Sequence, residues 1–183
     1  ELGAGRGDLA QALGALGAEV WAVEPFGFEE LRRRGIPVVS GLADLPAGLR
    51  FDGALAVDVV EHLPRPWEDL AALRGSLRPG AFVYVATMNS QGLNALLSGA
   101  RWRELNKRGH LLFFTPATLR RALAAAGLTG VRRLRWRIPI HAGARGGVDL
   151  ALQELGLDGE LRCLARAPGG EGARGVDPAG EER

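Results

Sequence analysis

The chain has 183 residues, a formal net charge of +2, a mean hydropathy of +0.01 and a single cysteine, Cys163. This length suits one domain with its own core, and a lone cysteine excludes a disulfide framework and a cysteine-based zinc site. No apolar run approaches the roughly 18 residues of a membrane span, so we expect a cytoplasmic protein without a membrane partner.

The chain opens with a glycine-rich turn that carries Gly3, Gly5 and Gly7. Apolar residues at helical spacing follow and predict a helix over 8–16, and the apolar run 20–23 predicts a strand that ends at Glu24. A strand, a glycine turn, a helix and a second strand with a terminal carboxylate form a nucleoside-binding half-site. The glycines allow a ligand to approach the backbone closely, and Glu24 can accept hydrogen bonds from ribose hydroxyls.

The glycine spacing argues against a dinucleotide. The fingerprint for that ligand is Gly-x-Gly-x-x-Gly, whereas here Asp8 stands at the third glycine position and would repel a pyrophosphate. A nucleoside ligand without phosphate fits this spacing better. In its glycine turn and Glu24 the chain resembles the class I S-adenosylmethionine-dependent methyltransferases. The resemblance implies S-adenosylmethionine as cofactor, bound by Glu1, Gly3, Gly5, Gly7 and Glu24. It also implies that the chain begins inside its first strand.

The remaining elements alternate between strand and helix patterns. In chain order we predict a helix over 28–34, strands over 37–40 and 51–57, a helix over 67–77, a turn at 78–80, a strand over 81–87, a helix over 116–126, a strand over 131–138, a helix over 148–155 and a strand over 161–167. This order predicts an α/β fold with a doubly wound, mostly parallel sheet and an antiparallel final pair. We expect one domain over 1–167 and a disordered tail over 168–183.

Three further motifs narrow the resemblance. An acidic-x-x-Glu-His-Leu element spans 58–63, a Leu-x-Pro-Gly turn spans 77–80, and a Gly-His-Leu element opens the segment 109–116. Over residues 1–127 the chain is similar to the ubiquinone-biosynthesis O-methyltransferase type and its bacterial relatives. This implies a Rossmann-like sheet with seven strands in the order 3-2-1-4-5-7-6, strand seven antiparallel, and a substrate lid over 88–114.

Candidate chemistry gathers in Asp58, Glu61, His62 and His110. Carboxylates and imidazoles can bind a divalent cation, as similar elements do in small-RNA 2′-O-methyltransferases. The favoured alternative has Asp58 facing the cofactor and both histidines lining the substrate pocket, with no metal. His110 and His62 are then the candidate general bases. In the family an acidic residue after strand three lies near the adenine; here the chain departs from the pattern, with Gly41 at that position and Asp44, three residues later, as the candidate contact.

The favoured function is methyl transfer to a small-molecule acceptor. RNA methylation is the first alternative, because residues 101–137 hold ten basic residues and one acid, Glu104, and can attract nucleic acid. The simpler interpretation is that these basic residues only form the solvated face of an edge strand and a helix. The second alternative is a non-catalytic binding module that keeps the fold. Within the expected lid, Trp102 either stacks on a planar acceptor or seals the lid onto the core.

Overall fold

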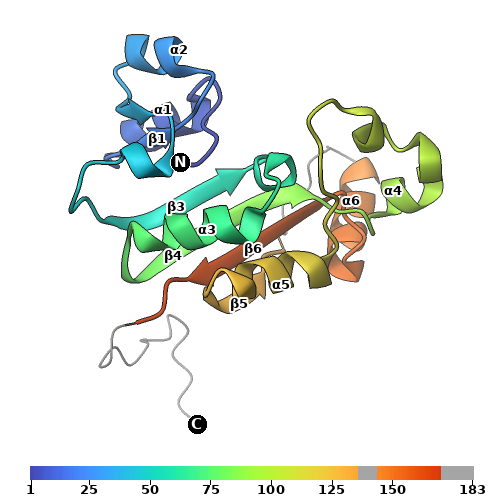
Figure 1. The fold of residues 1–183 in the computed structure, drawn as a ribbon. Coiled ribbons are helices and arrows are strands. Elements are labelled where there is room, and N and C mark those ends of the chain that lie inside the picture. Colours follow the sequence, from blue (N-terminus) through green and yellow to red (C-terminus); the bar gives the residue numbers. More distant parts are fainter. Residues whose placement is uncertain (136–143, 170–183) are drawn as a thin grey trace.

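In the computed structural model, residues 1–135 and 144–169 are described, and they form an α/β fold (Figure 1). The helices are α1 (Asp8–Ala15), α2 (Phe28–Arg33), α3 (Pro66–Gly75), α4 (Leu93–Ser98), α5 (Pro116–Ala125) and α6 (Ala144–Leu155). The strands are β1 (Ala22–Val23), β2 (Val38–Val39), β3 (Phe51–Val57), β4 (Leu77–Met88), β5 (Thr129–Arg133) and β6 (Glu160–Arg166). The predicted fold class is confirmed.

The strands form two ladders that meet at one residue near the start of the chain. Strand β1 pairs with β2, and the second ladder has the order β3-β4-β6-β5. Leu2 makes parallel bridges to Val23 on one side and to Ala56 on the other, and so joins the ladders. Strands β1 and β2, and β3 and β4, pair in parallel, whereas β6 runs antiparallel to both β4 and β5. The expected antiparallel final pair is therefore confirmed.

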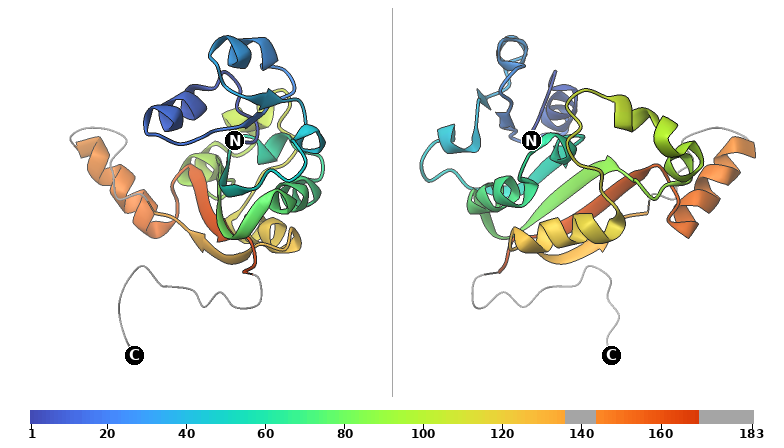
Figure 2. Two further views of the ribbon diagram at one scale, coloured as in Figure 1. Left: turned by 90° about the vertical axis from the view of Figure 1, so that its left-hand side faces the viewer. Right: turned by 45° about the vertical axis from the view of Figure 1, so that its right-hand side comes forward.

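Helices lie on both faces of this sheet. Figure 2 shows α3 and α5 on one side and α1 and α6 on the other. The main core lies around β3, β4 and β6 and includes buried leucines of α3 and α5, among them Leu70 and Leu119. A smaller cluster of Ala10, Leu31 and other apolar residues lies around α1 and α2. None of the helices in the described part of the chain combines the length and apolar composition that a membrane crossing needs.

Several predicted boundaries were wrong: the helix predicted over 67–77 ends at Gly75, and the helix predicted over 148–155 begins at Ala144. The turn predicted at 78–80 lies inside β4, where the pairing with β3 shifts register between Phe51 and Gly53. Gly80 has a φ of 79°, which lets the chain bulge and continue as a strand. The strand predicted over 131–138 begins at Thr129 and ends at Arg133. Residues 136–138 lie outside the described part, as does most of the tail, 170–183.

Between β4 and α5 the chain makes a long excursion, which we call the lid segment (residues 89–113). It contains α4 and the 3₁₀ turns η3 (Gly99–Arg101) and η4 (Arg103–Asn106). Its base is closed by a bridge between Asn89 and Phe114. The fully buried Asn89 side chain donates hydrogen bonds to the carbonyls of Gly156 and Asp158, at 3.3 and 2.9 Å. The lid segment is therefore fastened to the loop before β6.

Candidate active site

The glycine turn adopts a backbone that other residues rarely take. Gly3, Gly5 and Gly7 have φ values of 69°, 53° and 81°. A Cβ atom on Gly3 would lie 2.5 Å from the Val59 side chain, and one on Gly7 would lie 2.5 Å from Leu31. At Gly5 nothing lies within 4 Å of the same position. Gly3 and Gly7 are thus needed for packing, whereas Gly5 leaves open space beside the backbone.

Glu24 ties this turn to the segment after β1. Its carboxylate accepts hydrogen bonds from the backbone N–H groups of Gly5 (2.8 Å), Phe26 (2.8 Å) and Gly27 (3.3 Å). The residue is buried. A carboxylate has about four lone-pair sites, so these bonds leave room for a further donor. The sequence pointed to Glu24 as a ligand group, but it did not show that Glu24 also shapes the glycine turn.

The other two candidate cofactor residues on this side differ in setting. Glu1 lies beside β1, where its carbonyl accepts a hydrogen bond from Val23, and burial raises the pKa of its carboxyl group. Asp44 is exposed at the end of the 3₁₀ turn η1 (Leu42–Asp44) after β2. Its carboxylate accepts a hydrogen bond from the Ser40 hydroxyl at 2.7 Å. Asp44 therefore follows the carboxyl end of β2, whereas Glu1 lies alongside β1.

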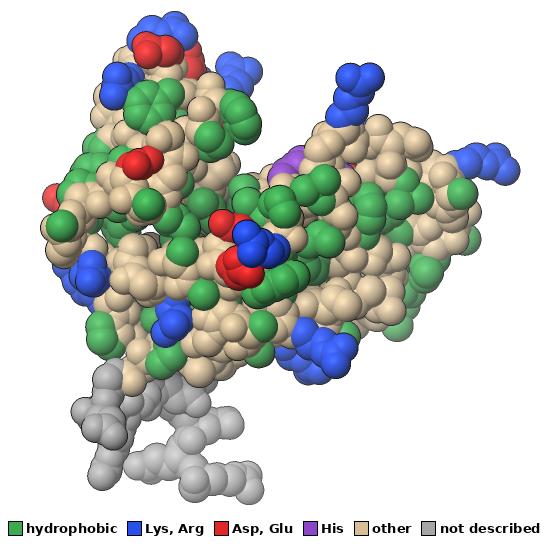
Figure 3. Space-filling model, in the orientation of Figure 1, with side chains coloured by type: hydrophobic (Ala, Val, Ile, Leu, Met, Phe, Trp, Pro, Cys, Tyr) green, Lys and Arg blue, Asp and Glu red, His purple; other side chains and the backbone are tan. Residues whose placement is uncertain are grey.

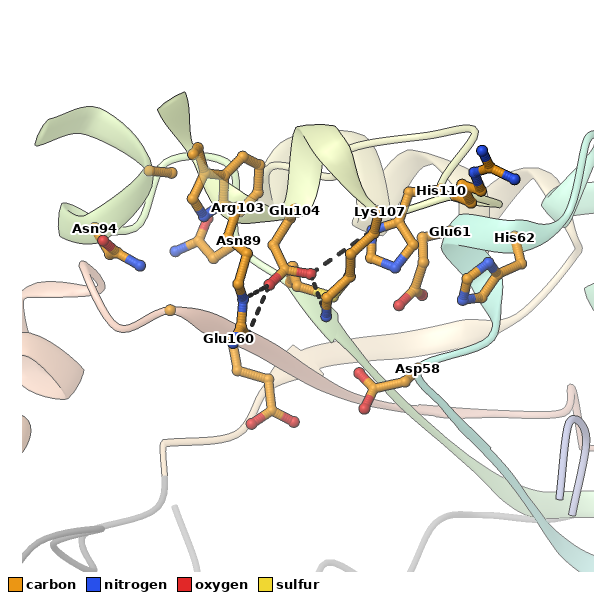
Figure 4. Close-up of a pocket in the computed structure, with 15 residues that line it drawn as sticks. Asp58, Glu61, His62, Asn89, Asn94, Arg103, Glu104, Lys107, His110 and Glu160 are labelled. Atoms are coloured by element: carbon orange, nitrogen blue, oxygen red, sulfur yellow. Dashed lines mark hydrogen bonds and ion pairs between the residues drawn. The ribbon is translucent and has the colours of Figure 1, made fainter. Parts of the chain in front are cut away.

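A cavity of about 670 Å³ opens at the carboxyl ends of β3 and β4, under the lid segment (Figure 4). In the space-filling view, a hollow separates the part around α1 and α2 from the lid, with histidine side chains at its edge (Figure 3). The structure brings the four-residue constellation together here. The lining residues are Asp58, Glu61, His62, Met88, Asn89, Asn94, Ala95, Trp102, Arg103, Glu104, Lys107, Arg108, His110, Gly159 and Glu160.

Asp58 occupies a strained position at the end of β3. Among the non-glycine residues of the described part, it alone has a positive φ, 51°. Its N–H donates to the carbonyl of Ala86 at 3.0 Å, which fixes this turn against β4. Such a conformation costs on the order of 1–3 kcal/mol and clusters at functional sites. Val59, the next residue, packs against Gly3, so the glycine turn and the cavity meet at residues 58–59.

Glu61 is buried behind the cavity wall. Its carboxylate accepts a hydrogen bond from the Thr87 hydroxyl at 2.8 Å, and its backbone carbonyl accepts from the N–H groups of Leu111 and Leu112. Within the described residues the second carboxylate oxygen, Oε1, is buried without a hydrogen-bond partner. A buried oxygen of this kind is costly unless a donor satisfies it, so a bound molecule is a natural partner.

His62 is held in one tautomer by the lid segment. Its Nδ1 lies 2.8 Å from the backbone carbonyl of Gly109. A carbonyl can only accept a hydrogen bond, so Nδ1 carries the proton and the neutral ring keeps its lone pair on Nε2. Gly109 has a φ of 92°, and a Cβ there would lie 3.2 Å from His62 Nδ1. A glycine at this position therefore lets the carbonyl reach the ring.

His110 lies beside His62, with ring centroids 4.7 Å apart. Glu61, His62 and His110 each offer one ligand atom, and these atoms lie within 4.8 Å of one another. This spacing would suit a divalent cation. It suits equally the role favoured from the sequence, a carboxylate and two imidazoles that face an acceptor hydroxyl. The cavity lining holds four carboxylates and three cations, and two of these cations, Lys107 and Arg103, are paired with Glu104.

Two carboxylates of the cavity were not among the predicted site residues. Glu104 is buried on η4, 2.6 Å from Lys107 Nζ and 3.2 Å from Arg103 Nη2. Although burial opposes ionisation, these cations hold the pKa of Glu104 below its usual value. Glu160 opens β6, and burial raises the pKa of its carboxyl group. The signal for Glu104 was its place as the one acid in a basic block, while nothing marked Glu160.

Trp102 packs against Phe113 of the same lid segment, and its two predicted roles stay predictions. It is 6% exposed, and its ring lies 5.6 Å from that of Phe113 at a tilt of 57°. Trp102 directly precedes η4 and Phe113 is the last residue of the lid segment, so this contact joins two distant parts of the lid. Most of the indole is thus engaged in holding the lid together, although the residue also reaches the cavity wall.

An α/β sheet with a glycine turn between the bridging residue Leu2 and the first helix, and with a cavity at its carboxyl edge, is typical of Rossmann-like nucleoside-binding folds. Residues 1–133 match a family model described as a methyltransferase domain. The chain therefore belongs to the methyltransferase domain family. It is 34% identical over 155 residues to a ubiquinone biosynthesis O-methyltransferase of Cereibacter sphaeroides, which covers 73% of this chain and 60% of the relative. The chain thus spans less than two thirds of that relative's length.

Solved structures show the same fold. A SAM-dependent methyltransferase from Archaeoglobus fulgidus superposes with a TM-score of 0.67 at 19% identity, over 90% of this chain and 83% of that one. A SAM-dependent methyltransferase from Thermotoga maritima, described as a possible histamine N-methyltransferase, gives a TM-score of 0.63 at 21% identity, over 91% and 79%. These likenesses support the Rossmann-like methyltransferase fold.

Proposed function

We propose that this chain transfers a methyl group from S-adenosylmethionine to a small-molecule acceptor bound in the cavity under the lid segment. The observation that carries the proposal is the junction at residues 58–59, where the glycine turn meets the cavity. A methyl donor on one side and an acceptor on the other would then lie next to each other. Holding two reactants together in this way is the main task of such an enzyme.

The cofactor half fits the donor. Gly5 leaves open space beside a backbone that a ligand can approach, and Glu24 keeps a lone pair for a ribose hydroxyl. Asp58, whose carboxylate has no hydrogen bond or ion pair among the described residues, suits the positively charged part of the donor. Glu1 and Asp44 are the outer members of this proposed cofactor set. When bound, S-adenosylmethionine supplies an electrophilic methyl group on a sulfonium.

The cavity half favours a hydroxyl acceptor. His62 presents Nε2 as a lone pair, and His110 lies beside it in the same cavity. An imidazole can take the proton of a hydroxyl as its oxygen becomes methylated, whereas a neutral amine needs no base. The buried and unpartnered Glu61 Oε1 can accept a hydrogen bond from a second donor of the acceptor. We assign His110 and His62 as the candidate bases.

The RNA alternative has less support. Several cations of the basic block lie against carboxylates: Arg103 and Lys107 against Glu104, Arg133 against Asp158, and Arg135 against Glu154. Figure 3 shows lysine and arginine side chains scattered over the visible face. Paired and dispersed charges attract a phosphate backbone less than a continuous basic patch does.

A methyl-transfer assay tests the proposal. The chain is incubated with methyl-tritiated S-adenosylmethionine and, in separate reactions, phenols, aliphatic alcohols, amines and bulk transfer RNA. We expect label in a hydroxylated small molecule. Label in RNA, with binding that falls steeply as salt rises, would replace the proposal by the RNA alternative. Cofactor binding without label in any acceptor would favour the non-catalytic module.

A further inference from the structure

We infer that Glu104 is a positioning residue for His110, which it holds with the proton on Nδ1 and the lone pair on Nε2. The inference deepens the proposed function and rests on it, because His110 is there the base that receives the acceptor proton. A general base works only when its lone pair, and not its N–H, faces the proton that it takes. The tautomer of His110 is therefore decisive for its role.

The geometry around His110 gives the first argument. Glu104 Oε2 lies 3.7 Å from His110 Nδ1, and the two side chains are only 8% and 5% exposed. Within the described residues Nδ1 is buried and makes no hydrogen bond. Figure 4 shows the Glu104 carboxylate and Glu61 on opposite sides of the His110 ring. With Nδ1 toward Glu104, the other ring nitrogen faces Glu61 and the cavity.

The charge state of Glu104 gives the second argument. Lys107 and Arg103 keep its pKa low, so the group is a carboxylate at neutral pH. A carboxylate has no proton to donate, so the nitrogen that faces it must carry one. The present 3.7 Å is longer than a hydrogen bond, and contacts of this kind commonly shorten when a ligand closes an active site.

His62 supplies an internal comparison. The Gly109 carbonyl fixes its Nδ1 proton as we infer that Glu104 fixes that of His110. Both rings would then present Nε2. The two partners differ in charge, since a carbonyl only orients the ring, whereas a carboxylate also stabilises the imidazolium that forms when the base takes a proton. This difference favours His110 over His62 as the base.

The competing explanation is structural: Glu104 would serve only to hold η4 through Lys107 and Arg103. Two variants separate the explanations. Lys107→Ala removes the 2.6 Å ion pair but leaves the carboxylate beside His110, where Arg103 Nη2, at 3.2 Å, still stabilises its charge. Glu160→Ala removes a carboxylate from the same cavity that has no contact with His110 among those found in the described chain. If Glu104 positions His110, neither variant changes the tautomer.

The test is nitrogen-15 NMR of the chain labelled in its three histidines, without cofactor or acceptor. It is run well above the ordinary histidine pKa of about 6.5, and the spectrum of His110→Gln assigns the signals. Protonated and bare ring nitrogens differ widely in chemical shift. We expect the Nδ1–H form of His110 to dominate in the unsubstituted chain and to become the minor form in Glu104→Ala, with no change in Lys107→Ala or Glu160→Ala.

Three outcomes would overturn the inference: a dominant Nε2–H form in the unsubstituted chain, an Nδ1–H form that survives Glu104→Ala, or an equal change in Lys107→Ala. The first outcome needs no variant, so the inference stays testable even if Glu104→Ala fails to fold. None of these outcomes bears on cofactor binding. A failure to bind S-adenosylhomocysteine would contradict the proposed function and leave the tautomer result unchanged.

Discussion

The two halves of the proposed site differ in whether backbone or side chains form them. On the proposed cofactor side, backbone geometry forms the site. Three glycines have positive φ, and the Glu24 carboxylate accepts hydrogen bonds from the backbone N–H groups of Gly5, Phe26 and Gly27. On the proposed acceptor side, the cavity is lined by charged and aromatic side chains from the segment after β3, the lid segment and the start of β6. One half constrains the backbone, whereas the other assembles side chains.

This difference explains how the two halves can vary. A backbone cradle tolerates few substitutions, because a Cβ on Gly3 or Gly7 would lie 2.5 Å from a packed side chain. The lid segment is instead anchored at its base, by Asn89, and lies outside the two ladders of the sheet. A fixed donor site beside a replaceable acceptor site suits a fold that serves many acceptors.

The largest expected effect lies on the acceptor side. His110→Gln should lower kcat by roughly 10²- to 10⁴-fold, the usual contribution of a general base. His62→Gln should lower it less, because His62 is exposed and is oriented only by a neutral carbonyl. The measurement is the initial rate at saturating cofactor with the hydroxylated acceptor that the methyl-transfer assay identifies. A larger loss in His62→Gln would reverse the assignment of the base.

On the cofactor side, two glycine variants sharpen the contrast. Gly7→Ala should lower the free energy of unfolding by about 1–2 kcal/mol for the left-handed backbone and by a further 1–3 kcal/mol or so for overpacking against Leu31. Gly5→Ala should show only the first cost, because its Cβ would meet open space. Urea unfolding measures both. Equal losses would mean that the packing around Gly7 relaxes.

The contrast between backbone and side-chain contacts also explains which parts of the site the sequence could predict. The glycine turn, Glu24 and β3 were predictable, because left-handed backbone selects glycine and a buried parallel strand selects an apolar run. The meeting of Asp58, Glu61, His62 and His110 was predicted from motif resemblance and is confirmed as a placement in one cavity. Their roles stay predictions.

Glu104 and Glu160 show where sequence reasoning stopped. Their charged partners are close in sequence, but their settings depend on burial in the wall of the cavity, which local periodicity does not show. The bulge in β4 was missed for a related reason. A Pro-Gly pair usually ends a strand, but here the pairing of Phe51 with Leu77 keeps residues 78–80 within the sheet. Tertiary contacts overrode the local signal.

A smaller effect is expected from pH. The pKa of Glu104 is lowered in the folded chain, so its carboxylate adds stability that is complete above the ordinary value of 4.5 and is lost as the pH falls through the lowered value. Glu104→Gln should therefore lose less stability than the unsubstituted chain over this acid range. Thermal unfolding between neutral and acid pH measures the slope. Identical slopes would show that Lys107 and Arg103 do not stabilise the charge.

The smallest effect is expected from chelation. Because the favoured role of Glu61, His62 and His110 as groups that face an acceptor hydroxyl needs no metal, EDTA should leave methyl transfer unchanged. The measurement is the initial rate before and after dialysis against the chelator. A loss of activity that Mg²⁺ restores would instead assign Glu61, His62 and His110 as metal ligands.

The central claim is that the glycine turn and Glu24 hold S-adenosylmethionine, and calorimetric titration with S-adenosylhomocysteine tests it most directly. The account predicts micromolar binding that weakens about tenfold or more in Glu24→Gln, because hydrogen bonds to a charged group contribute about 1.5–3 kcal/mol. Circular dichroism of both proteins controls for folding. The absence of binding by a folded chain, or equal affinity in folded Glu24→Gln, would contradict the account.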